Sequence, residues 1–370
     1  MAIIIFILIL SFLVIIHELG HFFAARMLGI KVNEFGMGYP PKVRKLFRWQ
    51  GTDFTLNWIP FGGFVRMAGE DSDPGRRDLA KPGEFYAASK EKRLLVVLAG
   101  ATVNFLFGIM AFAVIFSILG IPLEISQARI GEVAPDSPAA NVNLPVDVNI
   151  LAFENEGERV VINSPNEVIQ YVAENQGREV AMITSGQCEY LRCGEEEQQY
   201  QVYLRTKEET PANQGALGVV FKQFEMVYYP WYEMPFRSAA FGLEQALEMG
   251  QQILGALARL GKNLVSNGQV SEELAGPVGI VHQAQQSGIF EEGLLMILSF
   301  AGMLSINLAI MNVLPIPPLD GGKAVFTIFE AVVNPKYLFK VEYWMSYGGY
   351  FILLALVVFI TIRDVMRIFS

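Results

Sequence analysis

The chain has 370 residues, of which 52% are hydrophobic and 18% charged, with a net charge of −9 and a positive mean hydropathy. This composition excludes a typical soluble protein, and the length allows two or three domains. The apolar residues gather in four blocks, each long enough to cross a hydrocarbon core of about 30 Å. The sequence therefore predicts a polytopic α-helical membrane protein with about four transmembrane helices, at residues 1–28, 94–120, 293–319 and 343–362.

The first apolar block carries the sequence "IIHELGHFF" at residues 15–23. In a helix, His17 and His21 lie one turn apart on one face, so both imidazoles can reach one metal ion while Glu18 polarises a bound water. The alternative is a pair of histidines that form interhelical hydrogen bonds. Because ionisable side chains are unfavourable inside a bilayer and usually functional there, the pattern favours a metal site. The block lacks a charged n-region and a cleavage site, so we expect a membrane span rather than a signal peptide.

Charge predicts the orientation in the membrane. Residues 26–93 carry 13 Lys and Arg against 8 Asp and Glu, whereas residues 120–293 carry 10 against 24. Because Lys and Arg concentrate in cytoplasmic loops, we expect loop 29–93 inside, with the acidic region and both termini outside. Arg363 and Arg367, close to the C-terminus, argue mildly against this orientation.

The cytoplasmic loop contains an apolar segment, Thr52–Met67, with the sequence "TDFTLNWIPFGGFVRM". We expect a strand–turn–strand whose exposed edge can pair with an extended peptide. An ordinary solvated hairpin is the alternative, and "WIPFGGF" is too apolar for it.

The acidic region is expected to hold an extracytoplasmic α+β domain at residues 126–210. "SPNEVIQYVAENQG" predicts a helix with Ser164 as N-cap, Pro165 at N1, Glu167 at N3 and Gly177 as its stop. Alternating residues predict short strands around it, at Val148–Phe153, Glu179–Thr184 and Tyr200–Leu204.

Two further features belong to the same side of the membrane. Cys188 and Cys193 form either a disulfide in an oxidising compartment or two free buried thiols. Amphipathic connecting helices are expected at residues 211–292.

Two histidines do not complete a catalytic metal site, which takes three protein ligands and a water. His282 precedes the third span on the outside, so Asp320 in "NVLPIPPLDGG" is the better candidate. It ends an apolar span that runs in the same direction as the first. Pro315, Pro317 and Pro318 break the helix before it, and irregular backbone at that depth must line a cavity. The alternative is a carboxylate that faces water at a helix–loop junction.

Four motifs together carry a family resemblance. "HELGH", "GGFVRM", "AGATVNF" and "NVLPIPPLDGG" resemble the site-2 protease family, and more closely its bacterial regulator-of-sigma-E protease group. The resemblance implies a zinc metalloprotease that cuts transmembrane substrates within the membrane. It implies His17, His21 and Asp320 as Zn²⁺ ligands and Glu18 as the catalytic base.

The same resemblance implies where a substrate binds. Residues 52–67 match the family's membrane-dipping β-hairpin, and the implied substrate-binding residues are Gly62, Gly63, Phe64, Val65 and Asn312. The outside domain resembles a bacterial PDZ domain through "VAPDSPAA" and "LPVDVNILAF". The chain departs from the pattern at Val146, where such domains often have glycine, and at Lys323, where relatives commonly have histidine.

These features predict a function and its setting. We expect regulated intramembrane proteolysis at the inner (cytoplasmic) membrane, with an active site near the cytoplasmic side. The expected partners are the lipid bilayer and single-span membrane proteins, such as anti-sigma-factor-like substrates, first trimmed by another protease. We expect no nucleic-acid partner. The alternatives are a catalytically inactive scaffold that binds partners through its PDZ-like domain, which an intact Glu18 disfavours, and a metal transporter, for which the spans hold too few ionisable residues.

Overall fold

The chain forms two compact units in a computed structural model that describes residues 2–70, 80–155, 157–190, 192–267 and 276–369. One unit comprises Met1–Ile115 with Pro235–Ser370, and the other comprises Phe116–Met234. Parts of the expected cytoplasmic loop and of the connecting region, residues 71–79 and 268–275, lie outside the described residues.

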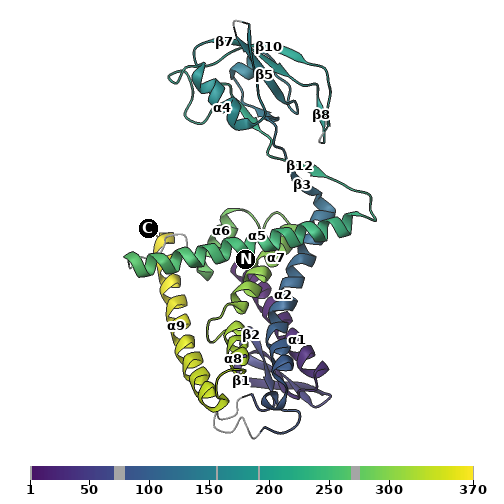
Figure 1. The fold of residues 1–370 in the computed structure, drawn as a ribbon, viewed down its shortest axis with the longest axis vertical. Helices are drawn as coiled ribbons and strands as arrows, with labels where there is room; N and C mark the ends of the chain where they lie inside the picture. The colour runs from purple at the N-terminus through teal and green to yellow at the C-terminus, as the bar shows by residue number, and fades with distance from the viewer. Residues whose placement is uncertain (1, 71–79, 156, 191, 268–275, 370) are drawn as a thin grey trace. The chain divides into compact units, whose positions relative to one another are not determined.

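The first unit contains the expected apolar helices (Figure 1). Within the described ranges, four helices are long and apolar enough to cross a membrane, which confirms a multi-pass membrane protein. They are α1 (Ala2–Met27), α2 (Lys90–Leu119), α7 (Leu294–Val313) and α9 (Pro335–Phe369).

Small residues allow close packing of these helices. A Cβ atom on Gly20 of α1 would lie 2.7 Å from the carbonyl oxygen of Ala99 in α2. A Cβ atom on Gly108 of α2 would lie 2.4 Å from Ile306 of α7. Glycine at helix crossings is typical of membrane bundles, because the backbones can then approach one another. Helix α2 is thus held closely against both α1 and α7.

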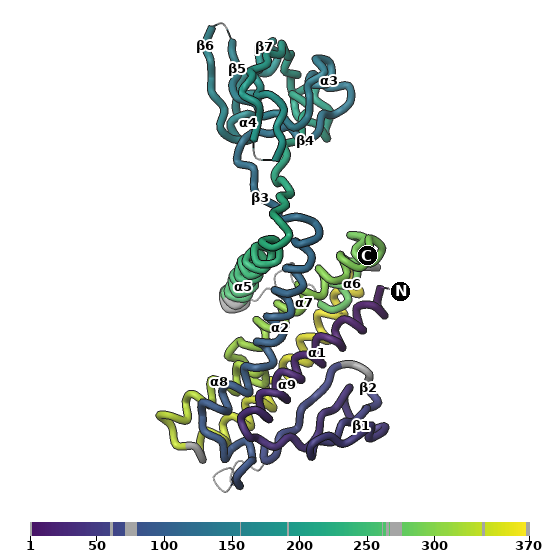
Figure 2. The backbone as a smooth tube through the Cα atoms, turned by 90° about the vertical axis from the view of Figure 1, so that its right-hand side faces the viewer, coloured from purple at the N-terminus to yellow at the C-terminus, as the bar shows by residue number. Residues whose placement is uncertain are grey.

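A sheet formed by β1 (Val32–Trp49) and β2 (Thr52–Met67) lies beside α1 (Figure 2). Residues 34–37 of β1 pair with residues 53–56 of β2 on one side and with residues 63–66 of β2 on the other. Both strand segments expected within residues 52–67 are present, but the expectation that they form a β-hairpin with each other is wrong. The two arms of that segment do not pair with each other, because the first half of β1 lies between them. Residues 63–66 form one edge of this sheet among the described residues, and residues 42–49 form the other.

The described part of the first unit also contains α5 (Met234–Asn267), α6 (Pro277–Gln286), α8 (Asp320–Phe329) and the short 3-10 helix η2 (Phe85–Ala87). Asp364 of α9 accepts hydrogen bonds from the backbone N–H groups of Gly276 and Gly279, each at 2.9 Å. This carboxylate fixes the start of α6, whose first N–H groups have no partner within the helix.

The second unit is an α+β module around one apolar core (Figure 1). Its four-stranded sheet has the order β10–β7–β5–β6. The bounds of its members are β5 (Ile150–Asn155), β6 (Glu158–Val161), β7 (Glu179–Thr184) and β10 (Gln198–Tyr203). Helix α4 (Pro165–Glu174) packs on this sheet through Tyr171, whose ring stacks on Phe153 at 4.4 Å.

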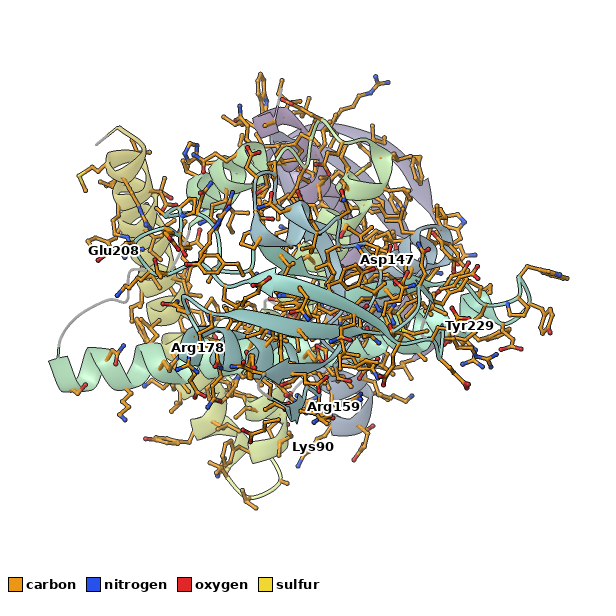
Figure 3. The ribbon with its side chains drawn as sticks, turned by 90° about the horizontal axis from the view of Figure 1, so that it is seen from above. Lys90, Asp147, Arg159, Arg178, Glu208 and Tyr229 are labelled. Atoms are coloured by element: carbon orange, nitrogen blue, oxygen red, sulfur yellow. A yellow bond between two sulfur atoms is a disulfide. The ribbon has the colours of Figure 1, made fainter. Side chains whose placement is uncertain are left out.

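The second unit also contains shorter elements. They are β3 (Ile121–Glu124), β4 (Ile130–Val133), α3 (Pro138–Asn141), β8 (Cys188–Glu189), β9 (Arg192–Cys193), β11 (Val219–Phe221) and β12 (Phe224–Val227). Strand β11 pairs with β4, so the module extends beyond the expected limit at residue 210. Cys188 and Cys193 are joined by a disulfide, which resolves the two alternatives for these cysteines. Charged side chains such as Arg159, Arg178 and Glu208 lie on the outside of the module (Figure 3).

Candidate metal centre

The two histidines of α1 lie together and are buried. His17 and His21 are each 7% exposed, and their ring centroids are 4.7 Å apart. Both are on the face of α1 that meets α2, and Gly100 of α2 provides the space for them. A Cβ atom at Gly100 would lie 2.5 Å from Nε2 of His21 and 2.7 Å from Nε2 of His17.

Asp320 reaches these histidines from the first residue of α8. The segment between α7 and α8 folds back tightly on α8, because two glycines follow the aspartate. A Cβ atom on Gly321 would lie 2.1 Å from the carbonyl oxygen of Val313, and one on Gly322 would lie 2.9 Å from that of Ile316. Helix α9 approaches the same segment through Gly349, where a Cβ atom would lie 2.1 Å from the carbonyl oxygen of Pro317.

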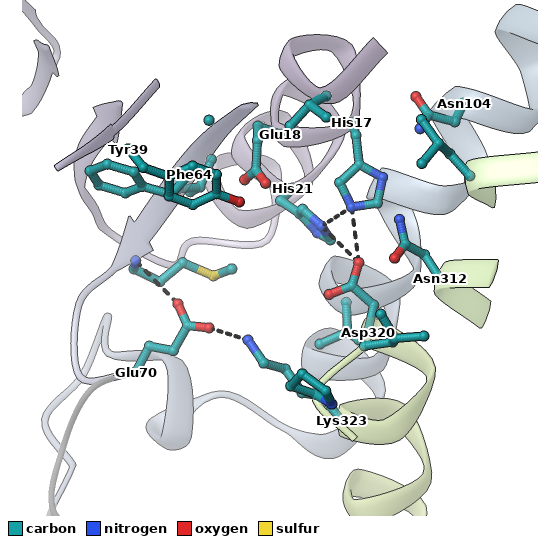
Figure 4. Close-up of a pocket in the computed structure, with 18 residues that line it drawn as sticks. His17, Glu18, His21, Tyr39, Phe64, Glu70, Asn104, Asn312, Asp320 and Lys323 are labelled. Carbon is teal, nitrogen blue, oxygen red and sulfur yellow. Dashed lines mark hydrogen bonds and ion pairs between the residues drawn. The ribbon is translucent and has the colours of Figure 1, made fainter. Parts of the chain in front are cut away.

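The three side chains form a donor triangle (Figure 4). Nε2 of His17 lies 3.0 Å from Oδ2 of Asp320, Nε2 of His21 lies 3.2 Å from the same oxygen, and the two Nε2 atoms are 3.1 Å apart. Ligands of a tetrahedral zinc ion at its usual bond lengths lie roughly 3.3 Å from one another. The donor types and their separations therefore fit a metal of this kind.

The tautomer of His21 also fits a metal ligand. Its Nδ1 lies 2.8 Å from the carbonyl oxygen of Val96, an acceptor that holds the ring proton on Nδ1. The lone pair of Nε2 is then free to face the donor triangle. Metal-binding histidines usually donate their other N–H in this manner.

Glu18 and the edge of the sheet share one cavity with the triangle, of about 470 Å³. Among the residues that line it are Gly63, Phe64, Val65 and Asn312. The Cγ atom of Glu18 lies 3.5 Å from where a Cβ on Gly63 would be. Gly62 is not part of the lining; it has a φ of +76°, and a Cβ there would lie 2.6 Å from the ring of Tyr39. His282 lies in α6 and does not belong to the triangle.

Further polar residues line this cavity, among them Lys323, which the sequence marked as a departure from the family pattern, and Glu70 and Asn104, to which the sequence assigned no role. Lys323 Nζ lies 2.8 Å from Oε1 of Glu70, and the Glu70 carboxylate raises the pKa of Lys323 above its ordinary value. Asn104, inside α2, also lines the cavity. Polar residues inside an apolar span are usually functional, so the position of Asn104 in the sequence was a sufficient reason to consider it for the site.

Two histidines and an aspartate that could hold a metal ion, with a carboxylate beside them among helices long enough to cross a membrane, fit the class of membrane metallopeptidases. Comparison with known families agrees with this class. The model of peptidase family M50 matches residues 5–356. The chain therefore belongs to peptidase family M50.

Curated relatives align along nearly the whole chain. A putative zinc metalloprotease of Agrobacterium fabrum is 28% identical, over 97% of this chain and 94% of its own length. The zinc metalloprotease RasP of Oceanobacillus iheyensis is 27% identical over 98% of each chain. The regulator of sigma E protease of Haemophilus influenzae is 26% identical, again over 98% of each chain.

Proposed function

We propose that the protein hydrolyses peptide bonds within or near transmembrane segments of other membrane proteins, with His17, His21 and Asp320 as its zinc ligands. It is a zinc metalloprotease of the site-2 type. The observation that carries the proposal is that the donor triangle and Glu18 share one cavity. Glu18 and both histidines lie on α1, an apolar helix long enough to span the membrane.

The chemistry divides between the metal and Glu18. A zinc ion held by His17, His21 and Asp320 would supply a bound water of lowered pKa and a positive charge for the substrate carbonyl. The Glu18 carboxylate takes the proton from the attacking water and then delivers it to the leaving amine. Glu18 lies beside the triangle and is not one of its three members, so it is free to act as a base.

The sheet edge at residues 63–66 offers a place for the substrate backbone. A transmembrane helix hides its carbonyl groups in its own hydrogen bonds, so a helical substrate must unwind locally before it is cut. The edge of a sheet can replace the lost bonds by pairing with the extended segment. Gly63, Phe64 and Val65 at this edge also line the cavity with Glu18. We therefore assign the edge, with Gly62 at its bend, as the substrate-binding strand.

Asn312 is assigned to the same task from the other side of the cavity. It lies near the C-terminal end of α7, and its carboxamide lines the cavity with the triangle (Figure 4). A carboxamide both donates and accepts hydrogen bonds, so it complements a peptide group.

We assign the protein to the inner membrane with its active site near the cytoplasmic side. The excess of Lys and Arg in residues 26–93 supports a cytoplasmic position for that loop and an extracytoplasmic position for the module and both termini. In this setting the sheet of β1 and β2 dips into the membrane from inside. The exposed Trp58 and Ile59 of β2 support this, because large apolar side chains at a sheet surface favour lipid over water.

The module is assigned as PDZ-like. Residues 215–219 and 221 line an open apolar groove of about 200 Å³ together with α4 and Gln176. PDZ domains hold an extended peptide between a strand and a helix in this manner. Asp147 has a φ of +57°, a conformation that Asp tolerates better than most residues, and its carboxylate lies 2.8 Å from Nζ of Lys222.

We propose that the module excludes substrates with bulky outside domains until another protease has trimmed them.

The proposed substrates are single-span membrane proteins, of which anti-sigma-factor-like proteins are one example. The name of the Haemophilus influenzae relative, regulator of sigma E protease, supports this choice.

Cleavage of a panel of single-span membrane proteins in proteoliposomes tests the proposal. The enzyme is assayed with zinc, after removal of zinc by a chelator, and after zinc is restored. Mass spectrometry locates the cuts. We expect zinc-dependent cuts inside or at the border of the apolar segment. Cuts confined to soluble portions, or cleavage that survives removal of the metal, would contradict it.

A further inference from the structure

The two histidines of the donor triangle differ in their outer contacts. His21 faces Asp320 through Nε2, and its Nδ1 meets the carbonyl oxygen of Val96 at 2.8 Å. Both ring nitrogens of His21 therefore have a defined role, and the ring cannot turn without losing a bond.

His17 has no such support on its second nitrogen. Its Nε2 lies 3.0 Å from Oδ2 of Asp320, but its Nδ1 is buried and has no hydrogen-bond partner among the described residues. When Nε2 of a histidine binds a metal, the proton is on Nδ1, and that N–H requires an acceptor. A buried donor without an acceptor is unfavourable, and it leaves the ring orientation undefined.

The side chain of Asn104 also lacks hydrogen-bond partners. Its side chain is fully buried, and in the described part of the chain neither Oδ1 nor Nδ2 has a partner. It lines the cavity of the donor triangle, and Figure 4 shows its carboxamide pointing toward the ring of His17. Buried polar groups in proteins are nearly always hydrogen-bonded, so an unpartnered carboxamide beside an unpartnered imidazole N–H requires an explanation.

Packing alone does not explain this asparagine. The position of its backbone is fixed by Ser305 of α7, whose Oγ donates a hydrogen bond of 2.8 Å to the main-chain oxygen of Asn104. That bond does not involve the carboxamide, so an apolar residue of similar size would preserve it.

We propose that Asn104 is a positioning residue for the metal centre, whose Oδ1 accepts the Nδ1–H of His17 directly or across one water molecule. Asn104 then holds His17 as the carbonyl oxygen of Val96 holds His21. The inference rests on the proposed metal site and goes beyond it, because it assigns an outer partner to the ligand that lacks one. Outer partners of this kind fix the tautomer and the orientation of the ring.

Zinc affinity tests this role without any substrate. Wild type, Asn104→Leu, Asn104→Asp and the control Ser305→Ala are purified in detergent, and zinc is titrated against a chelator of known affinity. The thermal unfolding of each metal-free protein is measured in parallel. Because no peptide is present, failure of this inference remains distinguishable from failure of the proposed proteolysis.

We expect Asn104→Leu to bind zinc about 10- to 100-fold more weakly, the usual effect of losing an outer partner. Its metal-free form should unfold at the wild-type temperature or above, because two unpartnered polar atoms are gone. Asn104→Asp keeps an acceptor and should bind zinc within a few-fold of wild type. Ser305→Ala should also bind zinc as wild type does, since it removes only the backbone contact.

Two results would overturn the inference. One is wild-type zinc affinity in Asn104→Leu. The other is an equal loss of affinity in Asn104→Leu and Asn104→Asp, which would show that the shape of the residue matters and the acceptor does not. If Asn104→Leu does not fold, Asn104→Ala replaces it as the variant without an acceptor. Asn104→Ala should then bind zinc more weakly, and Asn104→Asp, which keeps an acceptor, should bind it nearly as wild type does.

Discussion

Nε2 of His17 lies 3.0 Å from Oδ2 of Asp320, although 303 positions separate these residues in the chain. One comes from a membrane-spanning helix and the other from the first residue of α8. The proposed metal site therefore forms only when α1 packs against the start of α8.

Asp320→Asn should therefore lose both zinc and activity. Asparagine keeps the shape but removes the negative charge, so we expect cleavage to fall by more than the roughly 10- to 100-fold effect of an outer-partner mutation. Zinc content after dialysis and the rate of cleavage are the measurements. His282→Ala is the matched control and should retain both, since His282 is not part of the triangle. Full zinc occupancy and normal activity in Asp320→Asn would show that the third ligand is a different residue.

Gly100→Ala should disturb the proposed metal site, because Gly100 of α2 lies against the rings of His17 and His21. The added methyl group would lie 2.5 Å from Nε2 of His21, so the two helices or the rings must shift. We expect a marked fall in zinc affinity in a protein that still folds. Gly348→Ala, in α9, is the control, because among the described residues no atom outside its own stretch of helix backbone lies within 4 Å of the added methyl group. That change should be neutral or stabilising by up to about 1 kcal/mol. Equal zinc binding by Gly100→Ala and wild type would show that the rings do not lie as described.

Proline substitutions at the sheet edge should slow cleavage and leave zinc bound. Proline removes a backbone donor, so at least one of Phe64→Pro and Val65→Pro must disturb pairing with a substrate strand. Leu46→Pro lies on the opposite edge of the same sheet and serves as the control. Cleavage rates and zinc content are compared for all three. If the two edges respond alike, no substrate strand is added at residues 63–66.

Deletion of the module tests its role as a size gate. Ile125 N–H donates a 2.9 Å hydrogen bond to the carbonyl oxygen of Gln223, so residues 126–222 can be replaced by a short flexible linker. The pairing of β3 with β12 would be preserved. We expect the deletion variant to retain zinc and to cut untrimmed substrates that the full chain rejects. If untrimmed protein stays uncut while trimmed protein is cut more slowly, the module recruits substrates instead.

Local features of this fold could be predicted from the sequence. The helix at Pro165–Glu174 begins as expected: Ser164 Oγ accepts the Glu167 N–H at 3.4 Å, and the Glu167 side chain accepts the Asn163 N–H at 2.8 Å. The one-turn spacing of His17 and His21 and the positions of the four apolar helices could be predicted for the same reason. Each depends on residues within a few turns of one another, so periodicity and capping suffice.

The arrangement of the sheet could not be predicted in this manner. A pattern of apolar residues within Thr52–Met67 identifies extended chain but not its partner, because strand register is set by contacts far away in the sequence. The insertion of residues 34–37 between the two arms is such a contact. Gly348 and Gly349 illustrate the same limit. A glycine pair in an apolar span suggests a weakened helix, but α9 runs through it, and Gly349 allows close approach to Pro317.

Glu18→Gln is the most direct test of the central claim, which is that this carboxylate acts as the base of a zinc protease. The measurement is cleavage of one single-span substrate by wild type and variant, with zinc content determined on the same samples. The account predicts full zinc occupancy and loss of cleavage in Glu18→Gln, because a glutamine side chain cannot take a proton from water. Equal turnover by the variant and wild type would contradict it.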